Sequence, residues 1–327
     1  MIEQVVTVFG ASGFLGRHAV RALAKGGFGY RIRACSRYPH GSNYLQPMGH
    51  VGQIQLVRAN VLREDDVARA VAGATAVVNL VGTMSARSAD GFRAVHADAP
   101  ELIAKCARAA GVESLVHVSA IGADADSESA YARTKAEGEQ RVRDAFPEAT
   151  VLRPSLLFGP EDEFFNRFAN LARFLPALPL IGGGHTRFQP VFVGDVANAI
   201  VKAIENPATR GQTYQLGGPA IYSFRELMQL VLQVTNRRRL LLPLPFPLAM
   251  AQASVLQFLP GRLLTREQVH LLKRDNVVAE GALSLGDLGI VPDSLDAVLP
   301  TYLWRFRKKG QFENSAYERT IGTPAVR

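Results

Sequence analysis

A glycine-rich turn between the first predicted strand and the first predicted helix constrains this chain most. The strand covers residues 5–9 and the helix residues 17–24. Without a Cβ, such a turn can approach a ligand closely, and free N–H groups at a helix N-terminus attract negative charge. The turn predicts a pyrophosphate site in a nucleotide-binding domain; the alternative is a loop that needs glycine only for tight packing. The expected contacts are Gly10, Ser12, Gly13, Phe14, Leu15 and Gly16.

The glycine spacing is G-x-x-G-x-x-G, whereas most dinucleotide dehydrogenases carry G-x-G-x-x-G. In this respect the turn resembles that of extended and atypical short-chain dehydrogenases/reductases. The next predicted strand ends in Ser36, and Arg37 follows it. An NAD site places a carboxylate there for the ribose 2′-hydroxyl, and an NADP site tends to place an arginine. The pair therefore predicts NADPH as cofactor; the alternative is that Arg37 is a solvated surface charge.

The first half of the chain alternates predicted strands and helices, which is typical of an α/β fold with a Rossmann-type, doubly wound parallel sheet. Further strands are expected over residues 30–36, 54–57, 76–82, 114–119 and 151–154, and helices over 65–72 and 100–110. Ligands of such sheets bind at the carboxyl ends of the strands. The cofactor contacts predicted at and after these ends are Asn60, Val61, Leu80, Val81, Gly82, Pro154, Leu156 and Leu157.

Three residues are candidates for catalysis. Ser119 ends a predicted strand, and Tyr131 and Lys135 form a Y-x-x-x-K motif. Residues four apart share one face of a helix, so Lys135 is expected to lower the pKa of Tyr131 by favouring the phenolate. A tyrosine tuned in this way can pass a proton while the cofactor passes a hydride. The same tyrosine and lysine can also hold the cofactor without reacting, and this alternative stays open.

Composition places further limits on function. At 327 residues, with 47% hydrophobic and 20% charged residues, the chain is long and apolar enough for a full core. Two cysteines, Cys35 and Cys106, suggest buried thiols in a reducing compartment. The net charge of +8 favours acidic partners, but no nucleic-acid-binding motif is visible. No metal site is expected, because the histidines at 18, 96, 185 and 270 lack ligand spacing and are predicted to pack or to face solvent.

Several longer segments resemble the NAD(P)H-binding accessory subunits of respiratory complex I, a family of atypical short-chain dehydrogenases. The resemblance runs from the glycine turn to about residue 303, through residues 45–53, 79–82, 117–119, 135–139, 143–149, 153–162, 164–168 and 189–193. It implies a firmly held NADPH, other complex I subunits as partners, and a structural or regulatory role in proton-pumping NADH:ubiquinone oxidoreductase. The alternative is a free-standing NADPH-dependent reductase or epimerase that uses Tyr131 and Lys135.

The first predicted strand begins within five residues of Met1, so no targeting segment is expected. Together with the resemblance, this favours a bacterial version that lies peripherally on the cytoplasmic face of the inner membrane. A dinucleotide-binding core is expected over residues 1–160, and a mixed region with returning core elements and a small C-terminal lobe over 161–304. An extended docking tail is expected over 305–327. Capping boxes are predicted at Ser223 and Thr265, and Asp195 is predicted to be a helix N-cap.

One segment of the second half, residues 240–261, carries no charge and is flanked by arginines at 237–239. Four prolines and two glutamines interrupt it, and its helical part, residues 248–259, is too short to cross a bilayer. No transmembrane span is therefore predicted. The segment fits a helix that lies in an anionic lipid interface or beside a hydrophobic partner. The alternative is an ordinary buried helix of the second half.

Overall fold

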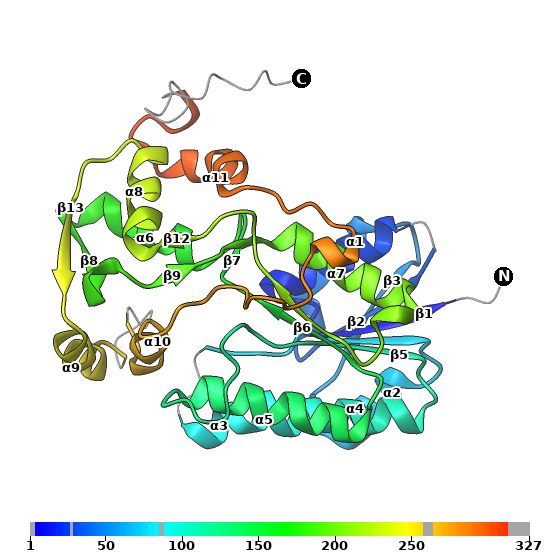
Figure 1. The fold of residues 1–327 in the computed structure, drawn as a ribbon. Coiled ribbons are helices and arrows are strands. Elements are labelled where there is room, and N and C mark those ends of the chain that lie inside the picture. Colours follow the sequence, from blue (N-terminus) through cyan, green and yellow to red (C-terminus); the bar gives the residue numbers. More distant parts are fainter. Residues whose placement is uncertain (1–3, 27–28, 85–87, 258–263, 313–327) are drawn as a thin grey trace. The chain divides into compact units, whose positions relative to one another are not determined.

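The computed structural model describes residues 4–26, 29–84, 88–257 and 264–312. The chain folds into two compact units (Figure 1). Unit 1 comprises residues 1–154, 193–216 and 278–291, and unit 2 comprises residues 155–192, 217–277 and 292–327. The polypeptide thus returns twice to unit 1 after leaving it.

In the described residues, unit 1 contains a seven-stranded parallel sheet in the order β11-β6-β5-β4-β1-β2-β3. Its strands are β1 (Val5–Phe9), β2 (Arg31–Ser36), β3 (Ile54–Arg58), β4 (Ala76–Asn79), β5 (Ser114–Val118), β6 (Thr150–Pro154) and β11 (Thr213–Leu216). The chain builds from β1 toward one edge and from β4 toward the other. The carboxyl ends of β1 and β4 therefore flank the switch point at which ligands of doubly wound sheets bind.

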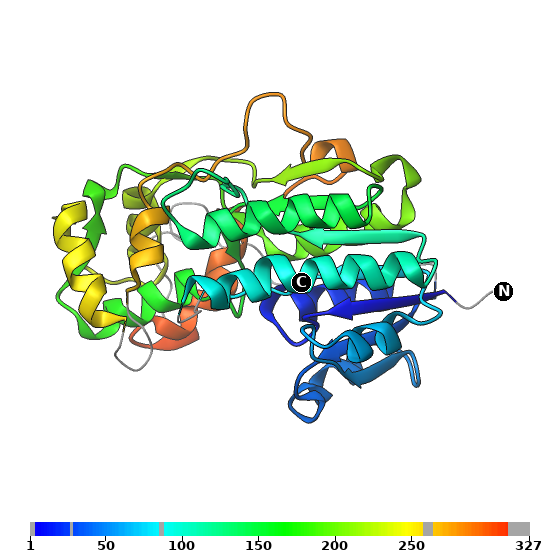
Figure 2. The same cartoon turned by 90° about the horizontal axis from the view of Figure 1, so that it is seen from below.

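Helices cover both faces of this sheet, which is why β4 and β5 are buried at every position. The helices of unit 1 are α1 (Phe14–Lys25), α2 (Glu64–Val71), α3 (Ala89–Arg93), α4 (Ala99–Ala109), α5 (Ala130–Ala145) and α7 (Val193–Glu205). In Figure 1, α1 and α7 lie on one side and α2, α4 and α5 on the other. Figure 2 shows α4 and α5 side by side as the cyan and green helices. Val77 and Leu115 pack beneath them, and burying one such side chain contributes about 2 kcal/mol.

Unit 2 is built from short strands and longer helices around an aromatic core. The strands are β7 (Leu157–Phe158), β8 (Ala177–Ile181), β9 (Arg187–Phe188), β10 (Val191–Phe192), β12 (Tyr222–Ser223) and β13 (Leu240–Leu244). The helices are α6 (Phe164–Phe174), α8 (Phe224–Val234), α9 (Phe246–Leu256), α10 (Arg266–Leu271) and α11 (Leu295–Leu303). The core includes Phe158, Phe165, Phe188 and Phe224.

A π-helical turn, Ala94–Asp98, lies between α3 and α4, and six further short helical turns are present in the described residues. They cover Pro39–Met48, Gly182–Gly184, Pro207–Thr209, Gly286–Leu288, Trp304–Phe306 and Gly310–Phe312. The turn Trp304–Phe306 begins one residue before the segment predicted as a docking tail, 305–327, and Gly310–Phe312 lies within it. Residues 313–327 of that segment lie outside the described part of the chain. No helix within the described ranges is long and apolar enough to span a bilayer.

The predicted fold class is confirmed by the sheet topology, and most of the predicted element ends of the first half fall within a few residues of the observed ones. Both predicted capping boxes are present, at Ser223 and Thr265. The prediction for Asp195 is wrong, because α7 begins at Val193 and Asp195 lies inside its first turn. The strand before this aspartate is only two residues long, so the helix starts earlier than the polar residue suggested.

Candidate functional site

The glycine turn has a backbone geometry that other residues do not fit. Gly10 has φ +80°, in the region that favours glycine. A Cβ on Gly16 would lie 2.2 Å from the Gly10 carbonyl oxygen, so α1 and the turn touch through backbone atoms. Gly13 is the N-cap of α1, and no side chain of the described residues caps this helix N-terminus. Its first N–H groups can therefore face an anion, which is what a pyrophosphate requires.

The end of β4 lies directly against this turn. A Cβ on Gly10 would be 3.0 Å from the carbonyl carbon of Leu80 and 3.2 Å from the backbone nitrogen of Val81. On another side, the Tyr44 hydroxyl donates a hydrogen bond to the Ser12 carbonyl oxygen (2.9 Å). The structure thus brings together the predicted contacts from the turn and from β4.

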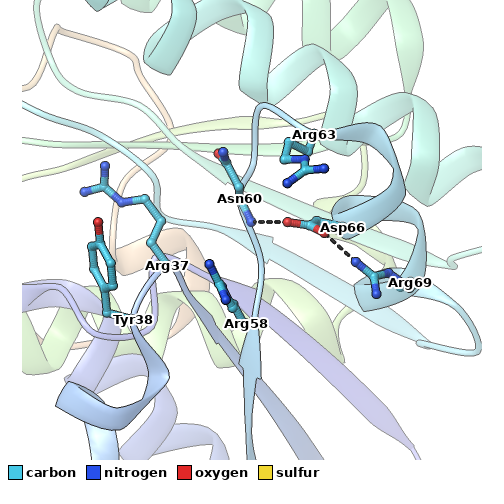
Figure 3. A pocket seen from close by; sticks show the side chains of 7 residues that line it. All are labelled: Arg37, Tyr38, Arg58, Asn60, Arg63, Asp66 and Arg69. Carbon is cyan, nitrogen blue, oxygen red and sulfur yellow. Dashed lines mark hydrogen bonds and ion pairs between the residues drawn. The ribbon is translucent and has the colours of Figure 1, made fainter.

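An arginine-rich pocket lies at the carboxyl ends of β2 and β3 (Figure 3). It has a volume of about 500 Å³ and is lined by Arg37, Tyr38, Arg58, Asn60, Arg63, Asp66 and Arg69. We call it the arginine pocket. Its carboxylate, Asp66, accepts a hydrogen bond from the Asn60 backbone N–H (3.0 Å) and forms an ion pair with Arg69. The Asn60 N–H, followed by Arg69, lowers the pKa of Asp66. Positive charge thus dominates the pocket.

Two of the arginines that line this pocket, Arg58 and Arg63, were missed by the sequence reasoning, which named Arg37 and Asn60. Arg58 is the last residue of β3 and pairs in register with Ser36 of β2. Arg63 immediately precedes α2. The sequence does carry a signal for Arg58: it ends the strand that follows the one ending in Ser36, and adjacent parallel strands end at the same edge of a sheet.

A second cluster lies at the carboxyl ends of β4 and β5. The Lys135 side chain is buried, and its Nζ donates a hydrogen bond to the Val118 carbonyl oxygen (3.3 Å). A Cβ on Gly82 would lie 3.5 Å from this nitrogen. Ser119 follows Val118, and its hydroxyl oxygen is buried without a hydrogen-bond partner among the residues that the structure describes. A buried hydroxyl of this kind fits a ligand that supplies the missing partner.

Burial sets the protonation of this cluster. It lowers the pKa of Lys135 to about 8, which Glu139 opposes, and it raises the pKa of Tyr131 to about 12. The prediction that Lys135 lowers the pKa of Tyr131 is therefore wrong for this structure. Desolvation of the phenol is the cause of the raised pKa. At neutral pH Tyr131 is a neutral phenol, which can donate a hydrogen bond but is not a base.

The helix that carries Tyr131 and Lys135 is fixed by an ion pair between a buried carboxylate and a partly exposed arginine. Glu139 of α5 is buried, and both its oxygens accept hydrogen bonds from Arg153 of β6 (Nε–Oε1 2.9 Å, Nη2–Oε2 2.5 Å). Such a two-point contact fixes orientation as well as distance. It therefore holds α5 against the sheet at a point one turn beyond Lys135.

His96 also belongs to this cluster, although the sequence predicted only a packing or surface histidine. Its ring is buried and meets the Tyr131 ring edge-to-face, with centroids 5.1 Å apart. Burial, followed by the Lys135 charge, lowers its pKa to about 3. His96 follows no spacing motif, because the fold rather than the local sequence brings it to the tyrosine.

The remaining predicted contacts are divided between the units. Pro154 ends β6 in unit 1, whereas Leu156 and Leu157 belong to unit 2, where β7 pairs with β10. Their roles at a cofactor stay predictions, as do those of Phe14, Leu15 and Val61.

A glycine turn at a helix N-terminus, an arginine pocket, and a tyrosine four residues before a buried lysine lie along one edge of a doubly wound sheet. Together they define the class as NAD(P)-binding α/β proteins. A family model described as "NAD dependent epimerase/dehydratase family" matches residues 6–217. The chain belongs to this family.

The relatives extend the comparison beyond this domain. The chain is 34% identical to "NADH dehydrogenase [ubiquinone] 1 alpha subcomplex subunit 9, mitochondrial" of Arabidopsis thaliana, over 98% of this chain and 82% of the relative. Identity to the protein of the same name in Mus musculus is 36%, over 89% and 78%. A "Ceramide reductase" of Caulobacter vibrioides is 31% identical over 74% of each chain.

A solved structure supports the fold alone. A dTDP-glucose 4,6-dehydratase from Streptomyces venezuelae, with NAD and TYD bound, superposes with a TM-score of 0.74 at 20% identity. The match covers 94% of this chain and 98% of that one.

Proposed function

We propose that this chain is an NADPH-binding accessory subunit of proton-pumping NADH:ubiquinone oxidoreductase, with a structural or regulatory role. The observation that carries the proposal is the extent of the relatives' similarity: 34% identity spans 98% of the chain. This similarity also includes unit 2. The similarity to the ceramide reductase covers less of the chain, with 31% identity over 74%.

The arginine pocket supports NADPH rather than NADH. A 2′-phosphate brings close to two negative charges, and guanidinium groups bind phosphate in two-point contacts. Arg37, Arg58 and Arg63 line the pocket, and Asp66, the one carboxylate among its described lining residues, forms its ion pair with Arg69. An NADH site would need a free carboxylate for the ribose 2′-hydroxyl.

Replacing Arg37 by Asp tests this choice. A charge-assisted hydrogen bond contributes about 1.5–3 kcal/mol, so we expect NADPH to bind about 10- to 100-fold more weakly. NADH affinity should change much less. The matched control is Arg21→Asp, an exposed position on α1, which changes the net charge equally away from the pocket. An equal loss for both nucleotides, or a native preference for NADH, would refute the assignment.

The chemistry of the second cluster supports a holding role for the cofactor. Burial keeps Tyr131 a neutral phenol, so the tyrosine is suited to donate a hydrogen bond to the nucleotide. When bound, the nucleotide would supply a nicotinamide capable of hydride exchange. A ligand at 100 times its dissociation constant adds about 2.7 kcal/mol to the stability of the form that binds it. Lys135, Tyr131 and Ser119 would then serve to bind and orient.

An uncharged surface on unit 2 supports a position beside the membrane. Residues 240–257 of β13 and α9 carry no charge, and Leu240, Leu242 and Val255 are each more than half exposed. We propose that this surface, the apolar edge, faces lipid or a membrane-embedded subunit on the cytoplasmic face of a bacterial inner membrane. Residues 258–261 of the predicted segment lie outside the described part of the chain.

The arginines that flank the apolar edge do not all serve as a basic surface, which corrects the prediction from sequence. Arg237 donates hydrogen bonds to the Phe306 carbonyl oxygen, and Arg239 donates one to that of Ala172. Both therefore hold unit 2 together. Arg238 is exposed and remains a candidate contact for an anionic lipid headgroup.

The location is tested with Leu242→Asp combined with Val255→Asp, measured by co-sedimentation with vesicles that contain anionic lipid and by assembly into the complex. Both should decrease, because the two carboxylates oppose burial and repel the surface. The control is Val291→Asp, at a still more exposed valine that lies in unit 1. Purification from native membranes then separates the two functions: co-migration with the respiratory complex supports the subunit, and a lone soluble protein supports the reductase or epimerase.

A further inference from the structure

The segment that precedes α4 contains a break in regular helix. α3 continues through a π-helical turn, Ala94–Asp98, before α4 begins. Such turns occur frequently at functional sites, because the widened turn re-aims a side chain. Here it carries His96, which is completely buried.

Both nitrogens of the His96 ring form hydrogen bonds, and each joins a different element. Nε2 accepts from the Thr83 backbone N–H (3.1 Å), just beyond the end of β4. Nδ1 lies 3.1 Å from the Thr134 hydroxyl oxygen of α5. An N–H can only donate, so Nε2 must be unprotonated and the ring proton sits on Nδ1, from which it is donated to Thr134. The Thr134 hydroxyl in turn donates to the Ala130 carbonyl oxygen (2.8 Å).

The same ring also fixes the tyrosine. His96 and Phe92 both meet the Tyr131 ring edge-on, with centroid separations of 5.1 and 6.3 Å. The π turn approaches α5 so closely that a Cβ on Gly138 would lie 1.8 Å from the His96 carbonyl oxygen. His96 therefore contacts α5 through its backbone, its ring edge and Thr134.

We propose that His96 is a positioning residue that holds Tyr131 and Lys135 in register with the end of β4, and thereby orders the nicotinamide half of the bound nucleotide. This inference rests on the proposed NADPH site. Lys135 Nζ and His96 Nε2 lie within 3.5 and 4.0 Å of a Cβ built on Gly82, so both face the same backbone. The arginine pocket lies at β2 and β3, so a dinucleotide with its adenosine there would extend its other half over β4 and β5.

The test compares the affinities of two ligands that differ in whether they carry the nicotinamide half. 2′,5′-ADP carries the adenosine and the 2′-phosphate but no nicotinamide, whereas NADPH carries both halves. His96→Leu removes both ring hydrogen bonds at similar volume, and Thr134→Val removes the partner on α5 while leaving the ring in place. In the full chain, we expect each change to weaken NADPH about tenfold, to decrease the fluorescence enhancement of its bound nicotinamide, and to leave 2′,5′-ADP affinity within about twofold.

Thr235→Val is the matched control. Thr235 is a buried threonine whose hydroxyl donates to the carbonyl oxygen four residues earlier, as Thr134 does, but it lies in unit 2. It should change neither affinity. Unchanged NADPH affinity in His96→Leu and Thr134→Val would overturn the inference, and so would an equal loss of both ligands. If the wild-type chain binds neither ligand, the proposed function is wrong and the inference falls with it.

Discussion

Gly16→Ala is the substitution whose effect can best be worked out from the structure. The added Cβ would lie 2.2 Å from the Gly10 carbonyl oxygen and 2.6 Å from that of Ala11. Both neighbours are backbone atoms, so no side chain can rotate away and the turn must move relative to α1. Overpacking of this kind costs about 1–3 kcal/mol, and with two backbone contacts we expect the upper end.

The assay is thermal unfolding with and without NADPH. For a domain of 150–250 residues, each kcal/mol shifts Tm by about 2–4 °C, so 3 kcal/mol lowers Tm by roughly 6–12 °C. The displaced N–H groups no longer meet the pyrophosphate, so NADPH should raise the Tm of wild type but not of Gly16→Ala.

Two other glycines give a graded control. A Cβ on Gly41 would meet no atom within 4 Å, and one on Gly13 would come 3.3 Å from the Gly10 carbonyl oxygen. Gly41→Ala should therefore stay within about 0.5 kcal/mol of wild type, and Gly13→Ala should fall between the two. Equal Tm values and equal NADPH responses for Gly16→Ala and Gly41→Ala would refute the reasoning.

Three further outcomes follow from the second cluster. Tyr131→Phe should leave respiratory turnover in membranes unchanged, and it should weaken NADPH binding by no more than about tenfold, because one hydrogen bond is lost. Loss of an NADPH-dependent reductase activity would favour the free-standing reductase or epimerase. NADPH affinity should fall as pH rises through the Lys135 pKa of about 8, because the deprotonated amine no longer offers a positive charge to the nucleotide. A flat profile in titration calorimetry would contradict this. Arg153→Leu leaves the buried Glu139 unpaired and should lower the free energy of unfolding, measured in urea, by about 3 kcal/mol. Arg108→Leu, at an exposed pair with Glu148, should lower it by less than about 0.5 kcal/mol. Equal losses would show that burial of Glu139 does not make its ion pair more important than an exposed one.

Local patterns account for what the sequence predicted well. The glycine turn, the strand before it and the helix after it depend on residues that are neighbours in the chain. The apolar runs that form β4 and β5 are buried on both faces, so their composition alone indicates central parallel strands. The carboxyl edge of the sheet, and with it the place of Arg37 and Lys135, then follows from topology.

The missed features depend on contacts between distant parts of the chain. His96 reaches Tyr131 because a π turn redirects it. From the sequence, Arg239 is expected to be a surface charge, but its guanidinium donates a hydrogen bond to the Ala172 carbonyl oxygen of α6, 67 residues earlier. The pKa of Tyr131 depends on how far the phenol is desolvated, and desolvation is a property of the packed fold rather than of a motif.

Two contacts, one on each side of α5, hold this helix in place before any nucleotide binds. Arg153 holds Glu139 from the sheet, and His96 holds Thr134 from the π turn, and neither contact involves a ligand. Fixing a flexible residue costs about 1–2 kcal/mol of conformational entropy. Tyr131 and Lys135 are already fixed when the chain folds, so this entropy is not lost again when the nucleotide binds. The pair is thus a preorganised receptor. Amide hydrogens of α5 should exchange slowly even without nucleotide, and added protection on binding should be concentrated in the glycine turn.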